Sequence, residues 1–449
     1  MTDRLTRYAT RAVPRYTSYP TAPHFSADLG ADTYDRWLGE LDPAQPLSLY
    51  LHVPFCHQLC WYCGCNMKLA SRPEPVERYA CTLAREIALV ASRLPARMTL
   101  SHLAWGGGTP NSLSPGDFSR VMEAVRAHFN IEPRAELAIE CDPRTLTNQM
   151  AATIGKEGFT RASFGVQEFD PEVQTAINRV QPPELVASAL DKLRNAGVGA
   201  VNFDLIYGLP FQTAQKLVST VKEAVRMEPD RFALFGYAHV PWMAKKQRLI
   251  DAAALPGASE RMIQADEAAR AIVAEGYERV GLDHFALPND PLAVAARSGT
   301  LRRNFQGYTT DDAGALIGVG ASSISRTPFG FVQNAVETGA WSRAIETGML
   351  PVAKGRALEG QDGLRASVIE ALMCGREADL GALGDAHGAP EKWWRDAEEE
   401  LAVLAADGLL RRVGDRINVA EEGRHLVRVV AAVFDAYLPR QRANHSVAV

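Results

Sequence analysis

Apolar and polar residues alternate in short stretches of this chain, and amphipathic stretches separate them. The first strand is predicted where every second residue is apolar, at Leu47, Leu49, Leu51 and Val53. Apolar residues then follow helical spacing at Val76, Tyr79, Leu83, Ile87 and Val90. Further strands are predicted at 100–105, 136–141, 162–167, 201–207 and 232–239, and further helices at 118–129, 183–196 and 213–227. Repeated strand–helix units between residues 46 and 290 favour a parallel sheet, either an open barrel or a doubly wound sheet.

The two ends of the chain depart from this repeat. Residues 1–36 lack a clean period and contain a run of turn formers and aromatics at 14–21, which indicates an extended arm laid over the body. Near the other end we predict a helix over 393–407, a hairpin over 409–419 that turns at Gly414-Asp415, and a last helix over 425–438. Together these elements resemble a small winged-helix unit, which would serve either DNA binding or packing.

The composition is that of an ordinary soluble protein. The 449 residues are 47% hydrophobic and 22% charged, and the net charge is −5. Because an acidic chain gives no reason to expect nucleic acid or an anionic membrane as a partner, we interpret the C-terminal unit as a packing or lid domain. The basic start is not followed by an apolar run, and no stretch reaches about 18 apolar residues. The sequence therefore predicts neither a signal peptide nor a membrane span, and favours the cytoplasm.

Four of the seven cysteines, Cys56, Cys60, Cys63 and Cys65, follow directly on the first predicted strand. Ligands bind at this place in α/β sheets, because crevices form at the carboxyl ends of the strands. In a reducing compartment such crowding indicates metal ligation rather than disulfides. The Cys-x3-Cys-x2-Cys spacing of the first three predicts an iron–sulfur cluster with one open iron. S-adenosylmethionine (SAM) can chelate that iron and be cleaved for radical chemistry.

Two alternatives to this cluster remain open on the residues alone. Structural zinc would use four cysteines, although zinc ribbons usually place them in two separated pairs. A closed four-cysteine cluster would need Cys65 as its fourth ligand, and Cys65 lies only two residues after Cys63. Because such close spacing strains ligation of one cluster, we interpret Cys65 as a neighbour of the cluster with an open role. Cys81, Cys141 and Cys374 are scattered and are interpreted as structural thiols.

Polar side chains mark the ends and one face of several predicted strands. The run Gly106-Gly107-Gly108-Thr109-Pro110 follows the second strand, where glycines either let backbone approach a ligand or make a tight turn. Glu140 and Asp204 share strand faces with other polar residues. Such groups are costly unless paired, so these faces predict either a polar ligand or a buried salt-bridge network with Arg161 or Arg179. Two polar–aromatic stretches are candidates for lining a pocket, at 283–285 and 303–308.

Five motifs together carry a resemblance that covers nearly the whole chain. They are Pro14-Arg-Tyr-Thr-Ser-Tyr-Pro-Thr21, His52-Val-Pro-Phe-Cys-His-Gln-Leu-Cys-Trp-Tyr-Cys-Gly-Cys-Asn66, Trp105-Gly-Gly-Gly-Thr-Pro110, Asn202-Phe-Asp-Leu-Ile-Tyr-Gly-Leu-Pro210 and Asn304-Phe-Gln-Gly-Tyr-Thr-Thr310. With these motifs the sequence resembles the oxygen-independent coproporphyrinogen III oxidases, radical SAM enzymes of haem biosynthesis. Chance agreement across all five motifs is not credible.

The resemblance implies an α/β fold, a partial (β/α)6 radical-SAM barrel with an N-terminal arm and a mainly helical, winged-helix-like C-terminal domain. The arm would span 1–45, the barrel 46–300, a barrel-closing or connecting segment 301–358 and the C-terminal domain 359–449. The resemblance also implies a 4Fe–4S cluster on Cys56, Cys60 and Cys63, and two bound molecules of SAM. By position, the contacts to SAM would be Tyr50, Tyr62, Gly107, Gly108, Thr109, Glu140, Gln167, Arg179, Asp204, Ala238 and Ile324.

The implied reaction is the oxidative decarboxylation of two propionate side chains of coproporphyrinogen III to vinyl groups, which gives protoporphyrinogen IX. A 5′-deoxyadenosyl radical would take a hydrogen from the propionate β-carbon, and loss of carbon dioxide and one electron would complete each vinyl. An unidentified reductant such as a flavodoxin or ferredoxin would supply electrons, and we expect a monomer that binds neither nucleic acid nor membrane. The substrate carboxylates need cationic partners, for which Arg15, Arg302 and Arg303 are candidates.

A haem-trafficking relative that keeps the cluster but lacks decarboxylase activity is the alternative. Such proteins resemble this family but usually lack the Cys65 position and the Tyr-Thr-Ser-Tyr-Pro stretch of the arm. Both features are present here, and they favour the enzyme.

Overall fold

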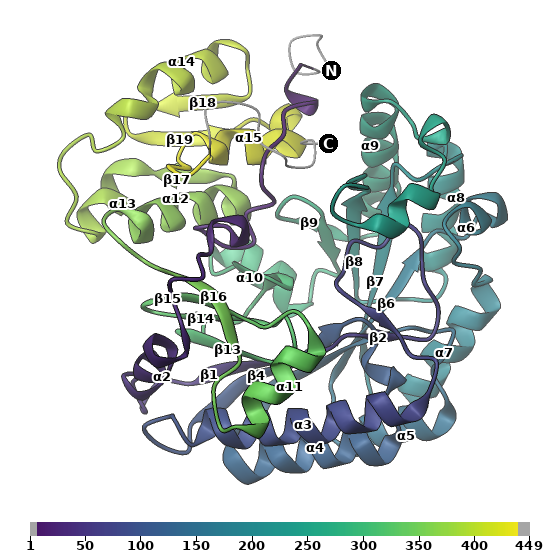
Figure 1. Ribbon diagram of the computed structural model, residues 1–449. Coiled ribbons are helices and arrows are strands. Elements are labelled where there is room, and N and C mark those ends of the chain that lie inside the picture. The colour runs from purple at the N-terminus through teal and green to yellow at the C-terminus, as the bar shows by residue number, and fades with distance from the viewer. Residues whose placement is uncertain (1–6, 439–449) are drawn as a thin grey trace.

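Six parallel strands, each followed by a helix, form the centre of the molecule in the computed structural model, which describes residues 7–438 (Figure 1). The strands lie side by side in the order β1 (Leu47–Val53), β4 (Thr99–Gly107), β5 (Asn130–Cys141), β6 (Arg161–Gln167), β7 (Ala200–Tyr207) and β8 (Arg231–Gly236). The principal helices after them are α3 (Pro73–Ala91), α4 (Pro115–His128), α5 (Asn148–Lys156), α7 (Pro183–Asn195), α8 (Ala214–Val225) and α9 (Ala258–Ala274). The repeat predicted from the sequence is therefore confirmed.

Shorter strands extend this sheet at both edges. Beyond β8 lies β10 (His284–Ala286), antiparallel to β8, and then β9 (Glu278–Val280), antiparallel to β10. Beyond β1 the segment predicted to connect the domains supplies β13 (Ala315–Val319), parallel to β1, and then β14 (Ile324–Thr327), β15 (Gly330–Asn334) and β16 (Val352–Ala357). The 12 strands run in one order from β16 to β9, so the described chain forms an open barrel rather than a closed one.

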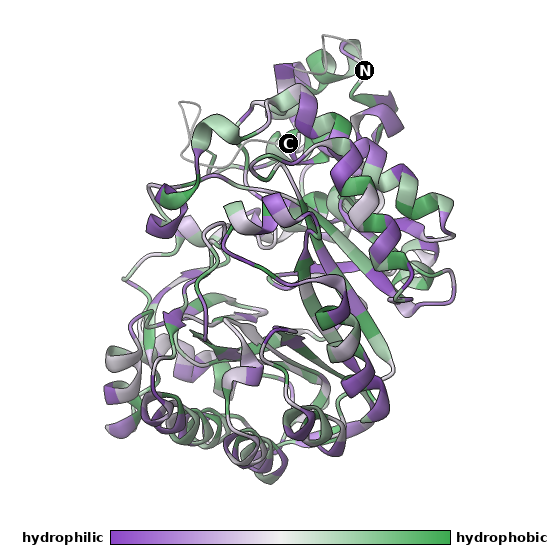
Figure 2. Ribbon diagram, turned by 90° about the vertical axis from the view of Figure 1, so that its right-hand side faces the viewer, coloured by the Kyte–Doolittle hydropathy of each residue, from purple (hydrophilic) through white to green (hydrophobic). Residues whose placement is uncertain are grey.

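The choice between an open barrel and a doubly wound sheet is settled by where the helices lie. Figure 1 shows the helices that follow the parallel strands around the outside of the sheet. Apolar side chains face them: Trp105 on β4 lies 4.4 Å, between ring centroids, from Phe118 on α4. Figure 2 shows strands that are largely green, while the surrounding helices carry green and purple residues. The inner face of the sheet carries the polar residues and encloses cavities.

Smaller elements complete the barrel and its loops. They are β2 (Phe55–Cys56), β3 (Lys68–Leu69), α6 (Pro171–Ala176), α10 (Pro291–Ser298), β11 (Arg302–Asn304), β12 (Gly307–Thr309) and α11 (Thr338–Glu346). The strand predicted over 232–239 ends earlier, at Gly236, because the following residues Tyr237 and Ala238 leave the sheet to line a cavity. Within residues 7–438, every helix is too short or too polar to cross a membrane.

The C-terminal domain resembles a winged helix, as predicted. It contains α12 (Asp362–Gly375), β17 (Glu377–Asp379), α13 (Leu380–Ala386), α14 (Glu398–Ala406), the hairpin β18 (Leu410–Val413) and β19 (Arg416–Val419), and α15 (Val427–Ala432). Two helix predictions here were too long. The helix predicted over 393–407 begins at Glu398, because Trp393 is buried in the preceding turn and donates its indole N–H to the Leu380 carbonyl at 3.0 Å.

The last helix, predicted over 425–438, ends at Ala432 because the residues after it bind the arm. The backbone N–H of Ala436 donates to the hydroxyl of Tyr19 at 3.0 Å, and the Asp435 carboxylate accepts from the hydroxyl of Tyr16 at 3.0 Å. Figure 1 shows the purple arm running between the yellow C-terminal domain and the barrel, before α2 (Ala31–Gly39). The first six residues of the predicted arm and the last 11 of the predicted C-terminal domain lie outside the described residues.

Glu86 on α3 joins that helix to the β13–β16 edge of the sheet. Its fully buried carboxylate accepts hydrogen bonds from the backbone N–H of Gly320 at 2.6 Å, the indole N–H of Trp341 at 2.9 Å and the amide of Asn334 at 2.6 Å. The Asn334 amide also donates to the Gly320 carbonyl and the Ser323 hydroxyl, so loss of the carboxylate leaves two buried donors unsatisfied, the Gly320 N–H and the Trp341 indole, at about 1–3 kcal/mol each.

Glu86→Ala is therefore expected to lower the free energy of unfolding by about 3 kcal/mol or more, as measured by urea denaturation. The control is Glu77→Ala, because Glu77 is exposed on the same helix and its loss is expected to change stability by less than about 0.5 kcal/mol. Equal stability of the two variants would contradict the role assigned to Glu86.

Candidate active site

The four clustered cysteines lie in one loop at the carboxyl end of the parallel strands. Cys56 ends β2, and all four sulfur-bearing side chains line a cavity of about 210 Å³. Neighbouring segments hold the backbone of this loop. The N–H of Trp61 donates to the Ile177 carbonyl at 3.0 Å, and the amide of Gln247 donates to the Tyr62 carbonyl at 2.7 Å. The loop is therefore anchored by the segments that connect β6 to α7 and β8 to α9.

Hydrogen-bond donors are directed at two of the sulfur atoms. The hydroxyl of Thr109 donates to Cys56 Sγ at 3.3 Å, and the guanidinium groups of Arg179 and Arg144 approach Cys60 Sγ at 3.3 and 3.5 Å. Donors at sulfur stabilise negative charge there and tune the potential of an iron–sulfur cluster. Burial raises the pKa of Cys56 to about 11, so the thiolate needs a cationic partner such as iron.

Cys65, whose role the sequence left open, lies in the same cavity as the other three. A hydrogen bond with Cys65 and the nearby charge of Lys246 lower the pKa of Cys63, and the same hydrogen bond raises the pKa of Cys65. Lys246 also donates to the Cys65 carbonyl at 3.4 Å. This arrangement places the fourth thiol beside the predicted ligands.

The glycine run begins with the last two residues of β4 and packs closely around the cavity. A Cβ on Gly106 would lie 2.7 Å from Glu140 Oε1, and a Cβ on Gly107, whose φ is +110°, would lie 2.5 Å from the ring of His52. A Cβ on Gly108 would lie 2.7 Å from the backbone oxygen of Phe55. Real Cβ atoms do not approach so closely. The positive φ of Gly107 and the backbone contact of Gly108 restrict these positions to glycine, whereas a Cβ on Gly106 would require the Glu140 side chain to move. The run brings the end of β4 against the cysteine loop.

The wall opposite the cysteines is rich in hydrogen-bond acceptors. Glu140 accepts from the N–H of Gly107 at 3.2 Å, and Asp204 accepts from the hydroxyl of Ser163 at 3.2 Å. Burial in the cavity wall and the nearby Glu140 carboxylate raise the pKa of Asp204 to about 7. Gln167, buried with φ at +67°, has a side-chain oxygen without a hydrogen-bond partner. This wall suits a cationic ligand that brings its own amine and hydroxyl donors.

The sequence left open whether the polar strand faces bind a ligand or form a buried salt-bridge network. Such a network is present in the same barrel, near the amino ends of the strands. Arg161 contacts Glu136 at 3.2 Å and Asp290 at 3.3 Å, and donates to the Asn202 side chain at 2.9 Å. Arg231 adds a contact of 2.7 Å to Asp290. The polar strand faces therefore serve two purposes. Near the amino ends of the strands they pair with one another, and near the carboxyl ends they line the cysteine cavity.

Eight of the eleven predicted SAM contacts line the cavity of the cysteines: Tyr62, Gly107, Gly108, Thr109, Glu140, Gln167, Arg179 and Asp204. Tyr50 lies on β1 and its hydroxyl is 3.0 Å from Nδ1 of His52. Ala238 lines a neighbouring cavity, and Ile324 lies on β14. Sequence reasoning missed Arg144 and Lys246, which also line the cysteine cavity. Neither belongs to a motif, and no pattern along the chain distinguishes them from surface cations.

The donor set fits a 4Fe–4S cluster with bound SAM. Three thiols at the predicted spacing share one cavity, donors point at two of them, and the facing wall holds a buried amide oxygen without a partner. Thiolates are the ligands of such clusters, and the amino group, hydroxyls and sulfonium of SAM match the acceptor wall.

Comparison with known proteins agrees with this geometry. Residues 50–224 match the radical SAM superfamily. The chain is 49% identical over 447 residues to the oxygen-independent coproporphyrinogen III oxidase of Bradyrhizobium diazoefficiens, which covers 100% of this chain and 99% of that one. It is 39% identical over 432 residues to that of Escherichia coli, with 96% and 94% covered. The solved structure of E. coli coproporphyrinogen III oxidase, described as a radical SAM enzyme, matches with a TM-score of 0.90 at 37% identity, covering 95% of this chain and 100% of that one.

Proposed function

This chain belongs to the family of oxygen-independent coproporphyrinogen III oxidases, which are radical SAM enzymes, and from that premise we propose that it converts coproporphyrinogen III to protoporphyrinogen IX by oxidative decarboxylation of two propionates. The observation that carries the proposal is the single cavity that joins the three predicted cluster ligands to an acceptor-rich wall. The identity of 49% over the whole chain supports the same substrate.

We propose that Cys56, Cys60 and Cys63 bind a 4Fe–4S cluster and that two molecules of SAM bind per chain. When bound, these groups supply a 5′-deoxyadenosyl radical that takes a hydrogen from the substrate. Arg179 and Thr109 would hold the sulfur atoms through hydrogen bonds. Tyr50, Ala238 and Ile324 remain proposed SAM contacts, and Cys65 remains a neighbour with an open role.

Glu140, Gln167 and Asp204 would orient SAM through its amine and hydroxyl donors, because all three present acceptor oxygens to the cavity. We also propose a flavodoxin or ferredoxin as the reductant, a monomeric state and a cytoplasmic location. The seven cysteines are free thiols, which suits a reducing compartment.

The proposed function is tested by an anaerobic assay of the reconstituted protein with SAM, a strong reductant and coproporphyrinogen III. The expected products are protoporphyrinogen IX, methionine and 5′-deoxyadenosine, and porphyrins are separated by chromatography after oxidation. Unchanged coproporphyrinogen together with stable binding of haem would favour the haem-trafficking alternative instead.

We expect the affinity for SAM to depend on pH through the Asp204 carboxylate. An ionised carboxylate accepts hydrogen bonds from two donors more readily than a protonated one, so binding is strongest above the pKa of about 7 and weakens as pH falls through it. Between pH 8 and pH 6 the ionised fraction of such a group falls about tenfold, and we expect SAM affinity to fall by up to about that factor.

Equilibrium dialysis of radiolabelled SAM against the reconstituted protein measures this dependence. Asp204→Asn is the control, because pH dependence that remains in this variant belongs to other groups, including the ligand itself. Identical pH profiles of affinity for the wild type and Asp204→Asn would contradict the prediction.

A further inference from the structure

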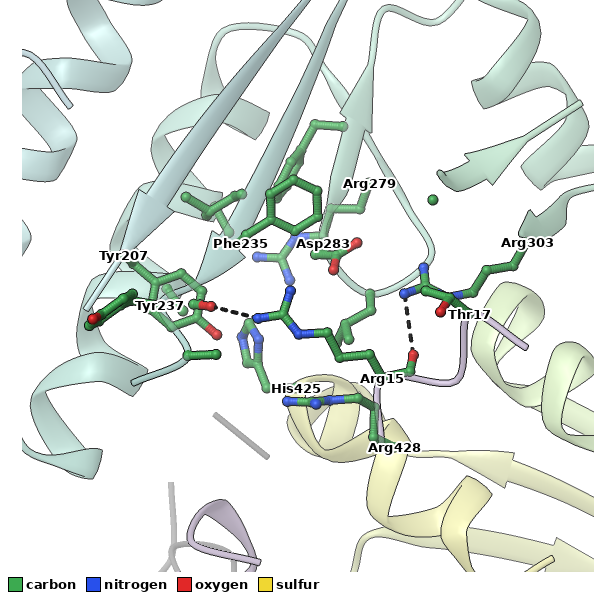
Figure 3. Close-up of a pocket in the computed structure, with 18 of the residues that line it drawn as sticks. Arg15, Thr17, Tyr207, Phe235, Tyr237, Arg279, Asp283, Arg303, His425 and Arg428 are labelled. Carbon is green, nitrogen blue, oxygen red and sulfur yellow. Dashed lines mark hydrogen bonds between the residues drawn. The ribbon is translucent and has the colours of Figure 1, made fainter. Parts of the chain in front are cut away.

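A second cavity, which we call the arginine pocket, lies where the arm, the barrel and the C-terminal domain meet. Among the described residues, its lining includes five arginines and one carboxylate: Arg15, Arg261, Arg279, Arg303, Arg428 and Asp283. Figure 3 shows the guanidinium groups of Arg15, Arg279 and Arg428 converging from different segments, with Arg15 at the centre. The pocket therefore brings together cations that are far apart in the sequence.

Hydrogen bonds to backbone oxygens help to position Arg15, Arg261 and Arg303. Arg15, exposed on the arm, donates to the Gly236 carbonyl at 3.1 Å. Arg303 donates to the carbonyls of Arg15 and Tyr16 at 3.4 and 3.3 Å, and lies over the ring of Tyr308. These contacts orient the guanidinium groups of Arg15 and Arg303, and a carbonyl adds no net negative charge to them.

Among the described residues, the carboxylates near these arginines are shared with other cations. The charge of Asp283 acts on Arg15 and Arg303, but its carboxylate also binds His284 at 2.8 Å. Glu421 lies 3.6 Å from Arg279 and also pairs with Arg376 and Arg424. Arg261 is buried; it donates to the Tyr237 carbonyl at 2.8 Å, and its Nε has no hydrogen-bond acceptor. Burial, together with the neighbouring charge of Arg15, lowers the pKa of Arg261. An excess of cations over carboxylates in the lining of a partly buried pocket is costly, and an anionic ligand would offset that cost.

The walls of the arginine pocket are apolar and aromatic, including Phe235 and Phe305. Phe235 and Gln306 also line the cavity inside the barrel. That inner cavity in turn shares Glu140 and Asp204 with the cavity of the cysteines. The arginine pocket, the inner cavity and the cavity of the cysteines are therefore neighbours in that order, so that a large ligand anchored at the arginines would face the cysteine loop.

We propose that the arginine pocket binds the propionate carboxylates of the substrate that the reaction leaves intact. The inference rests on the proposed function, and it deepens that function by naming the residues that hold the substrate. Arginine binds carboxylates in paired hydrogen bonds, and the aromatic walls suit an apolar macrocycle. The reacting propionate then lies in the barrel interior, on the side of the cysteine loop. Of the three arginines that the sequence offered, Arg15 and Arg303 line the pocket, whereas Arg302 does not.

Arg15→Gln and Arg261→Gln test the pocket, with Arg302→Gln as the matched control. Arg302 is exposed, precedes Arg303 and lies 3.7 Å from Glu370 outside the pocket. Loss of a charge-assisted hydrogen bond is expected to raise KM for coproporphyrinogen III by about tenfold or more in each test variant. Arg302→Gln is expected to keep the wild-type KM. Wild-type KM in both test variants would overturn the proposal while leaving the proposed function intact.

Fluorescence titration separates failure of the pocket from failure of the proposed function. The probes are coproporphyrin III, a stable tetracarboxylate, and its uncharged tetramethyl ester, each added to the reconstituted protein. We expect the wild type to bind the acid at least about tenfold more tightly than the ester, and Arg15→Gln and Arg261→Gln to lose most of this preference. If the wild type and both variants prefer the acid over the ester to the same extent, the proposed role of the arginine pocket is wrong, whether or not the wild type has oxidase activity. Arg15 is exposed, so its variant remains informative if Arg261→Gln fails to fold.

Discussion

Replacing Cys60 with alanine is expected to abolish formation of protoporphyrinogen IX and to lower bound iron. Cys60 is the buried member of the three predicted ligands, and two arginines, Arg144 and Arg179, direct hydrogen bonds at its sulfur. Loss of an outer partner of a metal ligand typically costs about 10–100-fold in affinity or activity, so loss of a ligand itself is expected to cost more. Without the sulfur, the two buried guanidinium groups also lose an acceptor.

Iron and sulfide analysis, the absorption spectrum of the reconstituted protein and the anaerobic assay measure this effect. Cys81→Ala is the matched control, because Cys81 lies on α3 with Arg120 at 3.4 Å and does not line the cysteine cavity. The control is expected to keep the wild-type iron content and turnover. Full turnover by Cys60→Ala would remove the basis of the proposed function.

Alternation of apolar residues predicted the central sheet well, because one face of each parallel strand packs on helices and the other faces a polar interior. The first strand matches its prediction residue for residue, Leu47–Val53. The same reasoning did not identify β13, Ala315–Val319, whose five residues are all buried and therefore do not alternate. At the chain end, contacts with the arm shortened the last helix, and no local pattern reports such a contact.

For the site, too, the sequence predicted the features that depend on neighbouring residues better than those built from residues far apart in the chain. Cysteine spacing and the glycine run are local, and the sequence placed both at the end of a strand. The acceptor wall was predicted from the polar residues that share one face of each strand. That pattern did not distinguish Glu140, which lines the cysteine cavity, from Glu136, which pairs with Arg161. The two residues share a face of β5 and differ in their distance from the carboxyl end of the strand. Arg261 lies on the barrel and Arg428 in the C-terminal domain, and both line the arginine pocket. The periodicity of apolar residues along the chain does not predict that these two domains meet there.

Gly108→Ala is expected to have the second large effect, through the backbone of the cysteine loop. The added Cβ would lie 2.7 Å from the oxygen and 2.8 Å from the nitrogen of Phe55, and 2.9 Å from the Val53 oxygen. Backbone atoms do not swing aside as a side chain does. Moreover, the Gly108 N–H donates to that Val53 oxygen at 2.8 Å, so relief of the clash strains a hydrogen bond as well. Phe55 precedes Cys56 on β2, and we expect its displacement to move the first cluster ligand.

We expect Gly108→Ala to retain at most about a tenth of the wild-type iron and turnover, because overpacking of this kind costs about 1–3 kcal/mol. Gly64→Ala is the matched control within the cysteine loop itself, since a Cβ on Gly64 meets no atom within 4 Å. The pair separates the effect of an added methyl group from the effect of its position. If both variants kept full iron content, the glycine run would act only as a turn. If both lost it, the loop would tolerate no change anywhere, and the packing of Gly108 against β2 would not be the cause.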